Sequence, residues 1–286
     1  MIEIIESDGY LDTLKQMSPT SGGISARTYL ATVQWPDGQV IDSYVKLFPA
    51  DVRIKELINE SFGFLLAGTV NLPQSNRAAL IKLDVNEFSI DTSNDPFASD
   101  NGFVYGWVTS SLGGDNLRKT FLKNYPNNVT NDEAQKLMIF LNNWSQFPNL
   151  IAFDDWIGNI DRNIGNLIFI NKNNVAIIDH GRLFGVENWL IQSINADLDC
   201  DNKMLNIFKE SHHGAIIHPS RCKPILDSAI HQQTSYTNAL VQVKDEIIKI
   251  DSIIDSKLST NINHFFDYFD RRFANIASRL PLALAA

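Results

Sequence analysis

The sequence is poor in cysteine, with Cys200 and Cys222 as the two thiols among 286 residues. Two cysteines are too few for a disulfide framework, and their separation does not match the ligand spacing of a metal site. We therefore expect two free thiols that are buried or have no chemical role, in a protein of a reducing compartment.

Long apolar runs and an excess of basic residues are also missing. No run approaches about 18 consecutive apolar residues, the length of a membrane-spanning helix, and the first ten residues are acidic, unlike a secretory signal. With 33 acidic against 24 basic residues the net charge is −9, which argues against a nucleic-acid binder because such proteins need a basic face. We expect a cytoplasmic protein that contacts neither membrane nor nucleic acid directly.

Residues 153–184 form the most informative stretch, because apolar runs alternate there with polar segments. Two apolar runs, residues 167–170 and 175–178, flank a polar turn, which predicts a β-hairpin. Asn, Gly and Asp crowd the segment before the first run, which predicts a loop.

Three polar side chains are expected to meet at one end of this hairpin. Asp161 and Asn166 lie five residues apart on the loop, and the returning strand brings Asp179 back beside Asn166. An amide oxygen and a carboxylate are ligands that Mg²⁺ takes, and a separate carboxylate can orient a phosphoryl acceptor. The stretch therefore predicts a phosphotransferase centre that uses Mg²⁺ and ATP.

Nearer the N-terminus lies a loop of small residues that includes Ser21, Gly22, Gly23 and Ser25. Glycine lets backbone N–H groups approach phosphates closely, so such a loop can cover a nucleotide. The motif is weak by itself, because loops of Ser and Gly mostly just join elements.

A lysine interrupts the apolar strand expected over residues 39–48. Lys46 is either a solvated surface residue or, if an acid holds it, a ligand for the α- and β-phosphates of ATP. The helix expected over residues 53–70 carries Glu60 as the partner, with Glu56 as the competing choice.

From residue 120 onward the pattern is helical. Thr130 and Glu133 fit a capping box at the start of one helix. Later helices are expected over residues 189–208, 223–230, 239–258 and 262–280. The predicted fold class is α+β.

In this order the motifs resemble those of the compact HipA-like serine/threonine kinases, which are related to the phosphatidylinositol-kinase and protein-kinase fold. The resemblance spans about residues 21–184 and is most specific in its last two motifs. It rests on the Gly/Ser loop, Tyr44-Val45-Lys46, Asn59-Glu60, Asn71-Leu72-Pro73, Gly158-Asn159-Ile160-Asp161-Arg162 with Asn166, and Ile178-Asp179-His180-Gly181.

The resemblance implies a two-lobed, protein-kinase-like fold. Residues 1–110 would form an ATP-binding lobe with an antiparallel sheet and one main helix. Residues 111–286 would form a mostly helical catalytic lobe that contains the hairpin. A hinge is expected at residues 111–114, with the adenine ring stacked near its backbone.

The resemblance also implies roles for single residues. Asp161 would orient the acceptor hydroxyl and accept its proton, while Asn166 and Asp179 would hold Mg²⁺. Lys46 would neutralise the phosphates, and Glu60 would fix the lysine. The Gly/Ser loop would cover ATP, and in this family a serine of that loop can itself be phosphorylated.

Kinases of this family act on serine or threonine of cytoplasmic proteins, some of them within toxin–antitoxin pairs. The resemblance therefore implies a protein substrate and an antitoxin partner. One alternative is a small-molecule phosphotransferase of the aminoglycoside or choline kinase type, although those enzymes typically carry His-Gly-Asp where this chain has Asn159-Ile160-Asp161. Another is a pseudokinase that serves as a binding module.

Other polar residues have a simpler explanation. Asp154 and Asp155 resemble a carboxylate dyad, but we expect one of them to cap a helix or to bond the loop that follows. His212, His213 and His218 do not have the spacing of a zinc-binding helix, and we do not expect a metal there.

Overall fold

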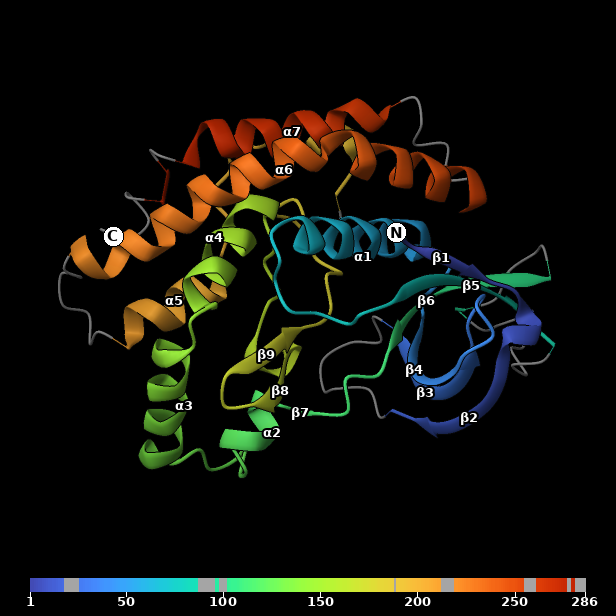
Figure 1. Cartoon of the computed structure of the whole chain (residues 1–286), viewed down its shortest axis with the longest axis horizontal. Helices are drawn as coiled ribbons and strands as arrows, with labels where there is room; N and C mark the ends of the chain where they lie inside the picture. Colours follow the sequence, from blue (N-terminus) through green and yellow to red (C-terminus); the bar gives the residue numbers. More distant parts are fainter. Residues whose placement is uncertain are drawn as a thin grey trace.

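The computed structural model describes residues 1–17, 26–86, 96–97, 102–187, 189–211, 219–254, 261–276 and 279–280. In this part of the chain six strands form one mixed sheet and most of the remainder is helical (Figure 1), which confirms the predicted α+β class. None of the described helices combines the length and the apolar character that crossing a bilayer requires.

The main sheet has the strand order β1-β5-β6-β4-β3-β2. Its strands are β1 (Glu3–Ile5), β2 (Tyr10–Gln16), β3 (Arg27–Gln34), β4 (Val40–Leu47), β5 (Ala78–Asp84) and β6 (Phe103–Ser110). The expectation of an antiparallel sheet is wrong at one edge, where β1 pairs in parallel with β5. Three strands and a helix lie between β1 and β5 in the chain, and they supply the long connection that a parallel pair needs.

The other elements follow the sheet in the chain. The helices are α1 (Arg53–Thr69), α2 (Leu117–Phe121), α3 (Asn131–Asn143), α4 (Phe147–Ile157), α5 (Lys203–Glu210), α6 (Pro219–Ile254) and α7 (Ile262–Ala274). A small antiparallel sheet contains β7 (Asp115–Asn116), β8 (Leu167–Asn171) and β9 (Asn174–Ile177). The predicted hairpin is therefore confirmed, and so is the capping box of Thr130 and Glu133.

The prediction of a helix over residues 189–208 is wrong for most of that range. The chain there makes one short 3₁₀ turn and further turns before α5 begins. The side chain of Asn195 accepts a hydrogen bond from the N–H of Asp197 at 3.0 Å, and Asn202 accepts one from Leu205 at 2.9 Å. Such local bonds give the backbone an alternative to the helix, and the second bond caps α5.

The two helices predicted over residues 223–230 and 239–258 are one continuous helix, α6. The polar residues between them break the apolar pattern but include neither glycine nor proline. Gln232 lies in that segment, is buried, and donates a hydrogen bond to the carbonyl oxygen of Asn149 at 2.7 Å. The amide nitrogen of this polar residue can therefore lie in the core because it has a partner.

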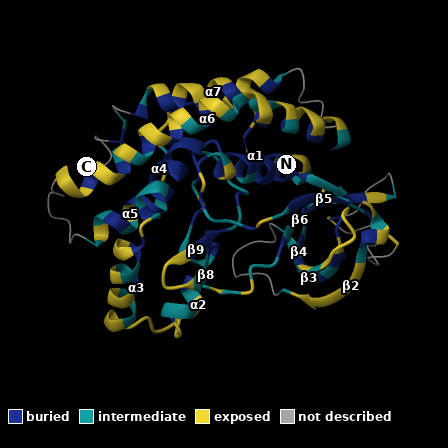
Figure 2. Cartoon of the chain, in the orientation of Figure 1, coloured by how far each residue is buried: buried dark blue, intermediate teal, exposed yellow. Residues whose placement is uncertain are grey.

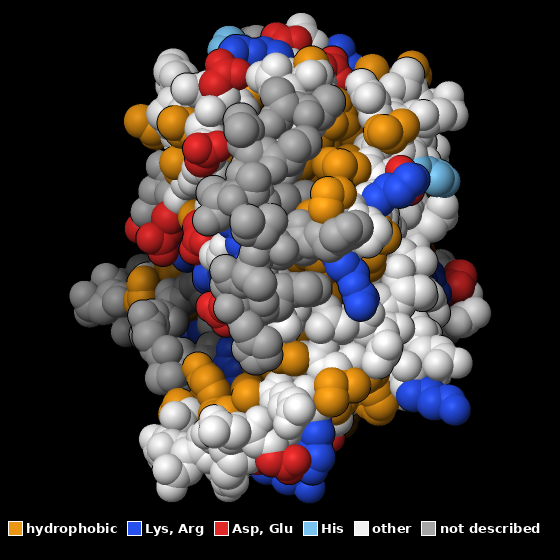
Figure 3. Space-filling model, turned by 90° about the vertical axis from the view of Figure 1, so that its left-hand side faces the viewer, with side chains coloured by type: hydrophobic (Ala, Val, Ile, Leu, Met, Phe, Trp, Pro, Cys, Tyr) orange, Lys and Arg blue, Asp and Glu red, His pale blue; other side chains and the backbone are white. Residues whose placement is uncertain are grey.

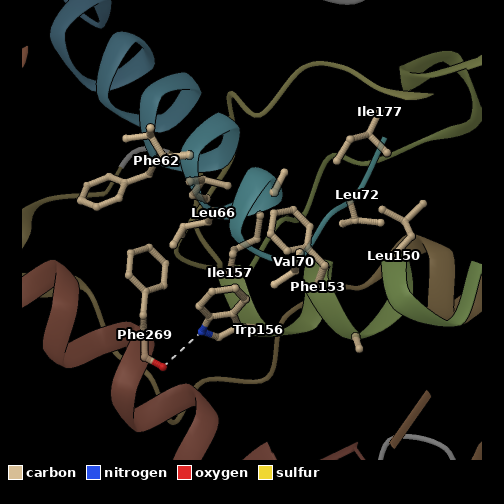
Figure 4. Packing of buried hydrophobic residues seen from close by; sticks show 14 of the residues in the cluster. Phe62, Leu66, Val70, Leu72, Leu150, Phe153, Trp156, Ile157, Ile177 and Phe269 are labelled. Atoms are coloured by element: carbon tan, nitrogen blue, oxygen red, sulfur yellow. Dashed lines mark hydrogen bonds between the residues drawn. The ribbon is translucent and has the colours of Figure 1, made fainter. Parts of the chain in front are cut away.

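Helix α1 lies between the sheet and the helices α6 and α7, and is largely buried (Figure 2). Phe62 of α1 packs against Phe265 and Phe269 of α7, with ring centroids 5.4 and 5.3 Å apart. In Figure 4 the ring of Phe62 lies beside that of Phe269, and Nε1 of Trp156 in α4 donates to the carbonyl oxygen of Phe269 at 3.2 Å. This core fixes α1 relative to the C-terminal helices.

A second, smaller core covers the opposite face of the sheet. Val45 and Leu47 of β4 point into it and are fully buried. Because side chains alternate along a strand, Lys46 between them points to the other face, toward α1 and the hairpin.

Charged residues of both signs share the outer surface. On the face shown in Figure 3, acidic and basic side chains are interspersed rather than gathered by sign. Among the described side chains on that face there is no broad basic area of the kind that nucleic-acid binding needs.

Candidate active site

A cavity of about 420 Å³ lies between the main sheet and the β8–β9 hairpin. Its volume falls in the range of about 300–1,000 Å³ that is usual for small-molecule sites. Lys46, Glu60, Asp161 and Asp179 all line it, so four of the predicted site residues come together there.

One wall of the cavity is apolar, and the chain between β6 and α2 passes along its edge. The apolar lining includes Ala26, Tyr44, Phe64, Trp107, Leu112 and Ile177. Gly113 and Gly114, from the predicted hinge, also line the cavity. A Cβ on Gly114 would lie 2.4 Å from the carbonyl oxygen of Phe169, so only glycine fits between this segment and β8.

Lys46, which lies on the same face of the sheet as Tyr44 and Trp107, forms two ion pairs at the cavity. Its Nζ lies 2.6 Å from Oε1 of Glu60 and 3.2 Å from Oδ1 of Asp179. Burial alone would lower the pKa of Lys46, but the two carboxylates raise it above its usual value. Partial removal from water opposes ionisation of Asp179 as well, although 43% of its side chain stays exposed, yet the ammonium lowers the pKa of that carboxyl to about 2. The site therefore holds one ammonium between two carboxylates, and the predicted pairing of Lys46 with Glu60 is present.

Three side chains of α1 form hydrogen bonds or an ion pair with residues 180–182, the segment that follows Asp179. Oε2 of Glu60 accepts from the backbone N–H of His180 at 3.0 Å, and Nδ2 of Asn59 donates to the carbonyl oxygen of Gly181 at 2.7 Å. Arg182 pairs with Glu56 at 2.7 Å. Glu56, the competing partner for Lys46, therefore binds a different cation.

Gly63 lies against His180, where α1 packs on this segment. A Cβ built on Gly63 would lie 2.2 Å from Cβ of His180, and His180 is itself buried. An alanine would displace one of the two elements, so the glycine sets their spacing.

Arg162 anchors the segment from the other side and is fully buried. Its Nε lies 3.3 Å from Oδ1 of Asp154, and its Nη1 donates to the carbonyl oxygens of Ile178 and Asp179. Nη2 lies 3.1 Å from Nδ1 of His180. Because arginine only donates, Nδ1 must be the acceptor and the imidazole is neutral with its proton on Nε2. Burial, with the arginine charge, holds the pKa of His180 well below its ordinary value.

Asp154 bonds the loop that follows α4, as we expected for one member of the Asp154–Asp155 pair. Its Oδ1 accepts from Nδ2 of Asn159 and from Arg162, both at 3.3 Å. Burial outweighs these partners and raises the pKa of Asp154 to about 6. Asp154 therefore supports the loop and does not face the cavity.

Asp161 stands on that loop at the cavity wall, with 55% of its side chain exposed. Its backbone N–H donates to Oδ1 of Asn159 at 3.0 Å. Its Oδ1 lies 2.9 Å from Nζ of Lys203, the first residue of α5. The carboxylate is accessible and is held at one oxygen.

Asn166 and Asp179 are joined through the hairpin. The carbonyl oxygen of Asn166 accepts from the N–H of Ile178, the residue before Asp179, at 3.0 Å. The side-chain amide of Asn166 makes no hydrogen bond to any residue that the structure describes. Asp179 has a positive φ of 65°, a conformation that costs energy for residues other than glycine.

The side-chain oxygens of these two residues are of the chemical kind that magnesium takes. Asp179 lines the cavity, whereas Asn166 is not among the described residues that line it. An amide oxygen without a partner and a carboxylate with 43% of its side chain exposed are hard oxygen ligands. Among the described residues there is no group of three or more His, Cys, Asp or Glu side chains that could hold a metal alone. Mg²⁺ characteristically completes its shell with waters and phosphate oxygens, so two protein ligands suffice.

Several sequence predictions fall outside the described residues. They concern Ser21, Gly22, Gly23 and Ser25 of the small-residue loop, and the histidines His212, His213 and His218.

Neither the contact of Lys203 with Asp161 nor the pairing of Arg182 with Glu56 was predicted from the sequence. Lys203 lies 42 residues from Asp161 in the chain, and no spacing rule links them. Arg182 follows the Asp-His-Gly motif directly. A basic residue next to this motif could have suggested an acidic partner on α1.

No protein-family model matches the chain, and a search of curated proteins finds no significant match.

Proposed function

We propose that the chain is an ATP- and Mg²⁺-dependent kinase that transfers the γ-phosphate to serine or threonine of a cytoplasmic protein. The observation that carries this proposal is Lys46 held by Glu60 and Asp179 in the cavity that Asp161 also lines. One fixed cation, a carboxylate beside it and a separate accessible carboxylate are the groups that phosphoryl transfer needs.

The nucleotide would lie along the cavity with its base on the apolar wall. Tyr44, Leu112 and Ile177 offer flat or apolar surface there, and the segment at Gly113 and Gly114 offers backbone. The phosphates would extend toward Lys46, whose ammonium neutralises them. In this proposal residues 1–110 and 111–286 would be the two lobes of a protein-kinase-like fold, and the nucleotide would bind between them.

Asn166 and Asp179 are the residues that would hold Mg²⁺. When bound, the ion neutralises phosphate charge as the γ-phosphoryl group leaves. Arg162 keeps the backbone of Asp179 in place through the two carbonyl oxygens that it binds. Glu60 keeps Lys46 directed at the same point, so the charges are fixed before the nucleotide arrives.

Asp161 would act on the acceptor. Its carboxylate orients the hydroxyl group toward the γ-phosphorus and receives the hydroxyl proton as the new bond forms. Because the carboxylate is accessible at the cavity wall, an acceptor side chain can approach it from solvent. The proposed protein acceptor and antitoxin partner rest on the resemblance of the motif Asn159-Ile160-Asp161-Arg162 to that of the HipA-like kinases.

A transfer assay tests this proposal. The chain is incubated with γ-labelled ATP, Mg²⁺ and dephosphorylated casein, and mass spectrometry locates the label on casein and on Ser21 or Ser25. We expect label on serine or threonine, and a loss of at least about 100-fold in Asp161→Asn because a positioned proton acceptor is removed. Transfer to an aminoglycoside or to choline instead would favour a small-molecule phosphotransferase. ATP binding without any transfer would favour a pseudokinase.

A further inference from the structure

The side chain of Lys203 reaches across from α5 to the loop that carries Asp161. Its Nζ lies 2.9 Å from Oδ1 of Asp161. We propose that Lys203 is a positioning residue for phosphoryl transfer: it holds Oδ1, so that Oδ2 is presented to the acceptor hydroxyl. This inference rests on the proposed kinase function and assigns to it a residue outside the Asp-Arg…Asn…Asp-His-Gly motifs.

The backbone at Lys203 is fixed by its neighbours. Asn202 is buried, donates to the carbonyl oxygen of Ile151 in α4 at 2.8 Å and accepts from the N–H of Leu205 at 2.9 Å. Met204 is fully buried in the main core. The lysine therefore projects from a point that is fastened to the same helix, α4, that leads into the Asp161 loop.

Asp161 is held on its other sides by the loop itself. Its N–H donates to Oδ1 of Asn159, and its carbonyl oxygen accepts from Nδ2 of Asn163, both at 3.0 Å. Within the described part of the chain Oδ2 accepts no hydrogen bond. Lys203 thus occupies one carboxylate oxygen of a residue that lines the cavity, and the other oxygen has no partner among the described residues.

Neither the stability of α5 nor that of the ion pair explains why a lysine stands at position 203. A cation in the first turn opposes the helix dipole, so α5 alone would favour an acid there. The pair is exposed, with 39% of the lysine and 55% of the aspartate side chain accessible, and such exposed pairs contribute little to folding stability. The consequence of the contact is therefore expected at Asp161 rather than in the folding of α5.

The transfer step shows what the contact would do. The acceptor oxygen forms a bond to the γ-phosphorus, while the bond from that phosphorus to the β,γ-bridging oxygen breaks and its electron pair leaves with ADP. The acceptor proton passes to Oδ2 of Asp161 and later to solvent. The ammonium of Lys203 keeps its own protons and its contact with Oδ1, so it restricts rotation of the carboxylate during the step.

The test compares Lys203→Met, Lys203→Arg and a matched control, Lys209→Met, which changes a lysine in the last turn of the same helix. Each protein is assayed with ATP, Mg²⁺ and dephosphorylated casein for kcat, and by titration for the Kd of ATP. We expect Lys203→Met to lower kcat about 10- to 100-fold, the effect of a misplaced catalytic group, with Kd unchanged within about twofold. Lys203→Arg should recover kcat to within about fivefold of the wild type, because it restores the cation. Lys209→Met should match the wild type.

Three outcomes would overturn the assignment. They are an unchanged kcat in Lys203→Met, an equal loss in Lys203→Arg, and a loss of ATP affinity that accompanies the loss of kcat. The failure of the kinase proposal looks different, because the wild type itself would then neither bind ATP with Mg²⁺ nor transfer phosphate.

Discussion

Glu60 accepts a hydrogen bond from the backbone N–H of His180 at 3.0 Å, while its other carboxylate oxygen binds Lys46 at 2.6 Å. One buried side chain thus joins the lysine of β4 to the segment that carries Asp179. Together with the bonds of Asn59 and Glu56 to the same segment, it fixes α1 against the motif. The charges of the cavity are consequently held in place by the fold itself.

Replacing Glu60 by glutamine tests the strength of this link. The substitution leaves the largely buried ammonium of Lys46 with Asp179 as its one carboxylate partner. We expect the free energy of unfolding to fall by about 1–3 kcal/mol, as for a buried group that loses a charged partner. Urea unfolding measures it, and Glu3→Gln is the control, because Glu3 pairs with Arg77 at a partly exposed site and should cost about 1 kcal/mol or less. Equal effects of the two substitutions would contradict the role of Glu60.

A substitution at Gly63 tests the close approach of α1 to His180. Gly63→Ala should destabilise the protein by about 1–3 kcal/mol through overpacking and should weaken ATP binding, because the Asp179 segment must move. Gly68→Ala, in the same helix, meets its nearest atom at 3.5 Å and should be neutral or stabilising by up to about 1 kcal/mol. Thermal unfolding with and without ATP and Mg²⁺ distinguishes the two. A Gly63→Ala protein with unchanged stability and ATP binding would contradict the packing described.

The pH dependence of stability should report Glu56. Burial outweighs its pairing with Arg182 and raises the pKa of Glu56 to about 7 from 4.5. A raised pKa means that the folded state binds the proton more tightly, so this contribution is present below pH 4.5 and is lost as the pH rises through 7. Relative to Glu56→Gln, the wild type should gain about 1–3 kcal/mol between pH 8 and pH 5. Parallel curves for the two proteins from urea unfolding would contradict the shift.

Two aspartates should separate binding from transfer. Asp179→Asn removes a carboxylate that would hold Mg²⁺ and should weaken Mg²⁺-dependent ATP binding by about 10-fold or more, as expected for a hard-ion ligand. Asp161 pairs with Lys203 and not with Lys46, the lysine proposed to bind phosphate, so Asp161→Asn should keep the ATP Kd within about twofold while kcat collapses. Calorimetric titration with and without Mg²⁺ measures both. Loss of binding in Asp161→Asn alone would reverse the assigned roles.

The sequence predicts the local parts of this site better than its long-range parts. The hairpin follows from two apolar runs around a polar turn, and the capping box from Thr130 and Glu133, because both signals lie within a few residues. The pairing of Lys46 with Glu60 needed the order of motifs as well as the pattern of each element.

Contacts between segments that are distant in the chain are not visible in a local sequence pattern. Lys203 meets Asp161 through the packing of α5 on α4, and β1 joins β5 across more than one intervening element. The helix predicted over residues 189–208 does not form over most of that range, because the side chains of Asn195 and Asn202 accept hydrogen bonds from nearby backbone N–H groups. The spacing of apolar residues carries no information about such bonds.

A crystal structure with Mg²⁺ and a non-hydrolysable ATP analogue tests the central claim most directly. We predict the nucleotide in the cavity with its phosphates at Lys46, and Mg²⁺ bound by the side-chain oxygens of Asn166 and Asp179 at about 2.0–2.1 Å. A nucleotide bound elsewhere, or a metal ion that neither Asn166 nor Asp179 contacts, would contradict the account.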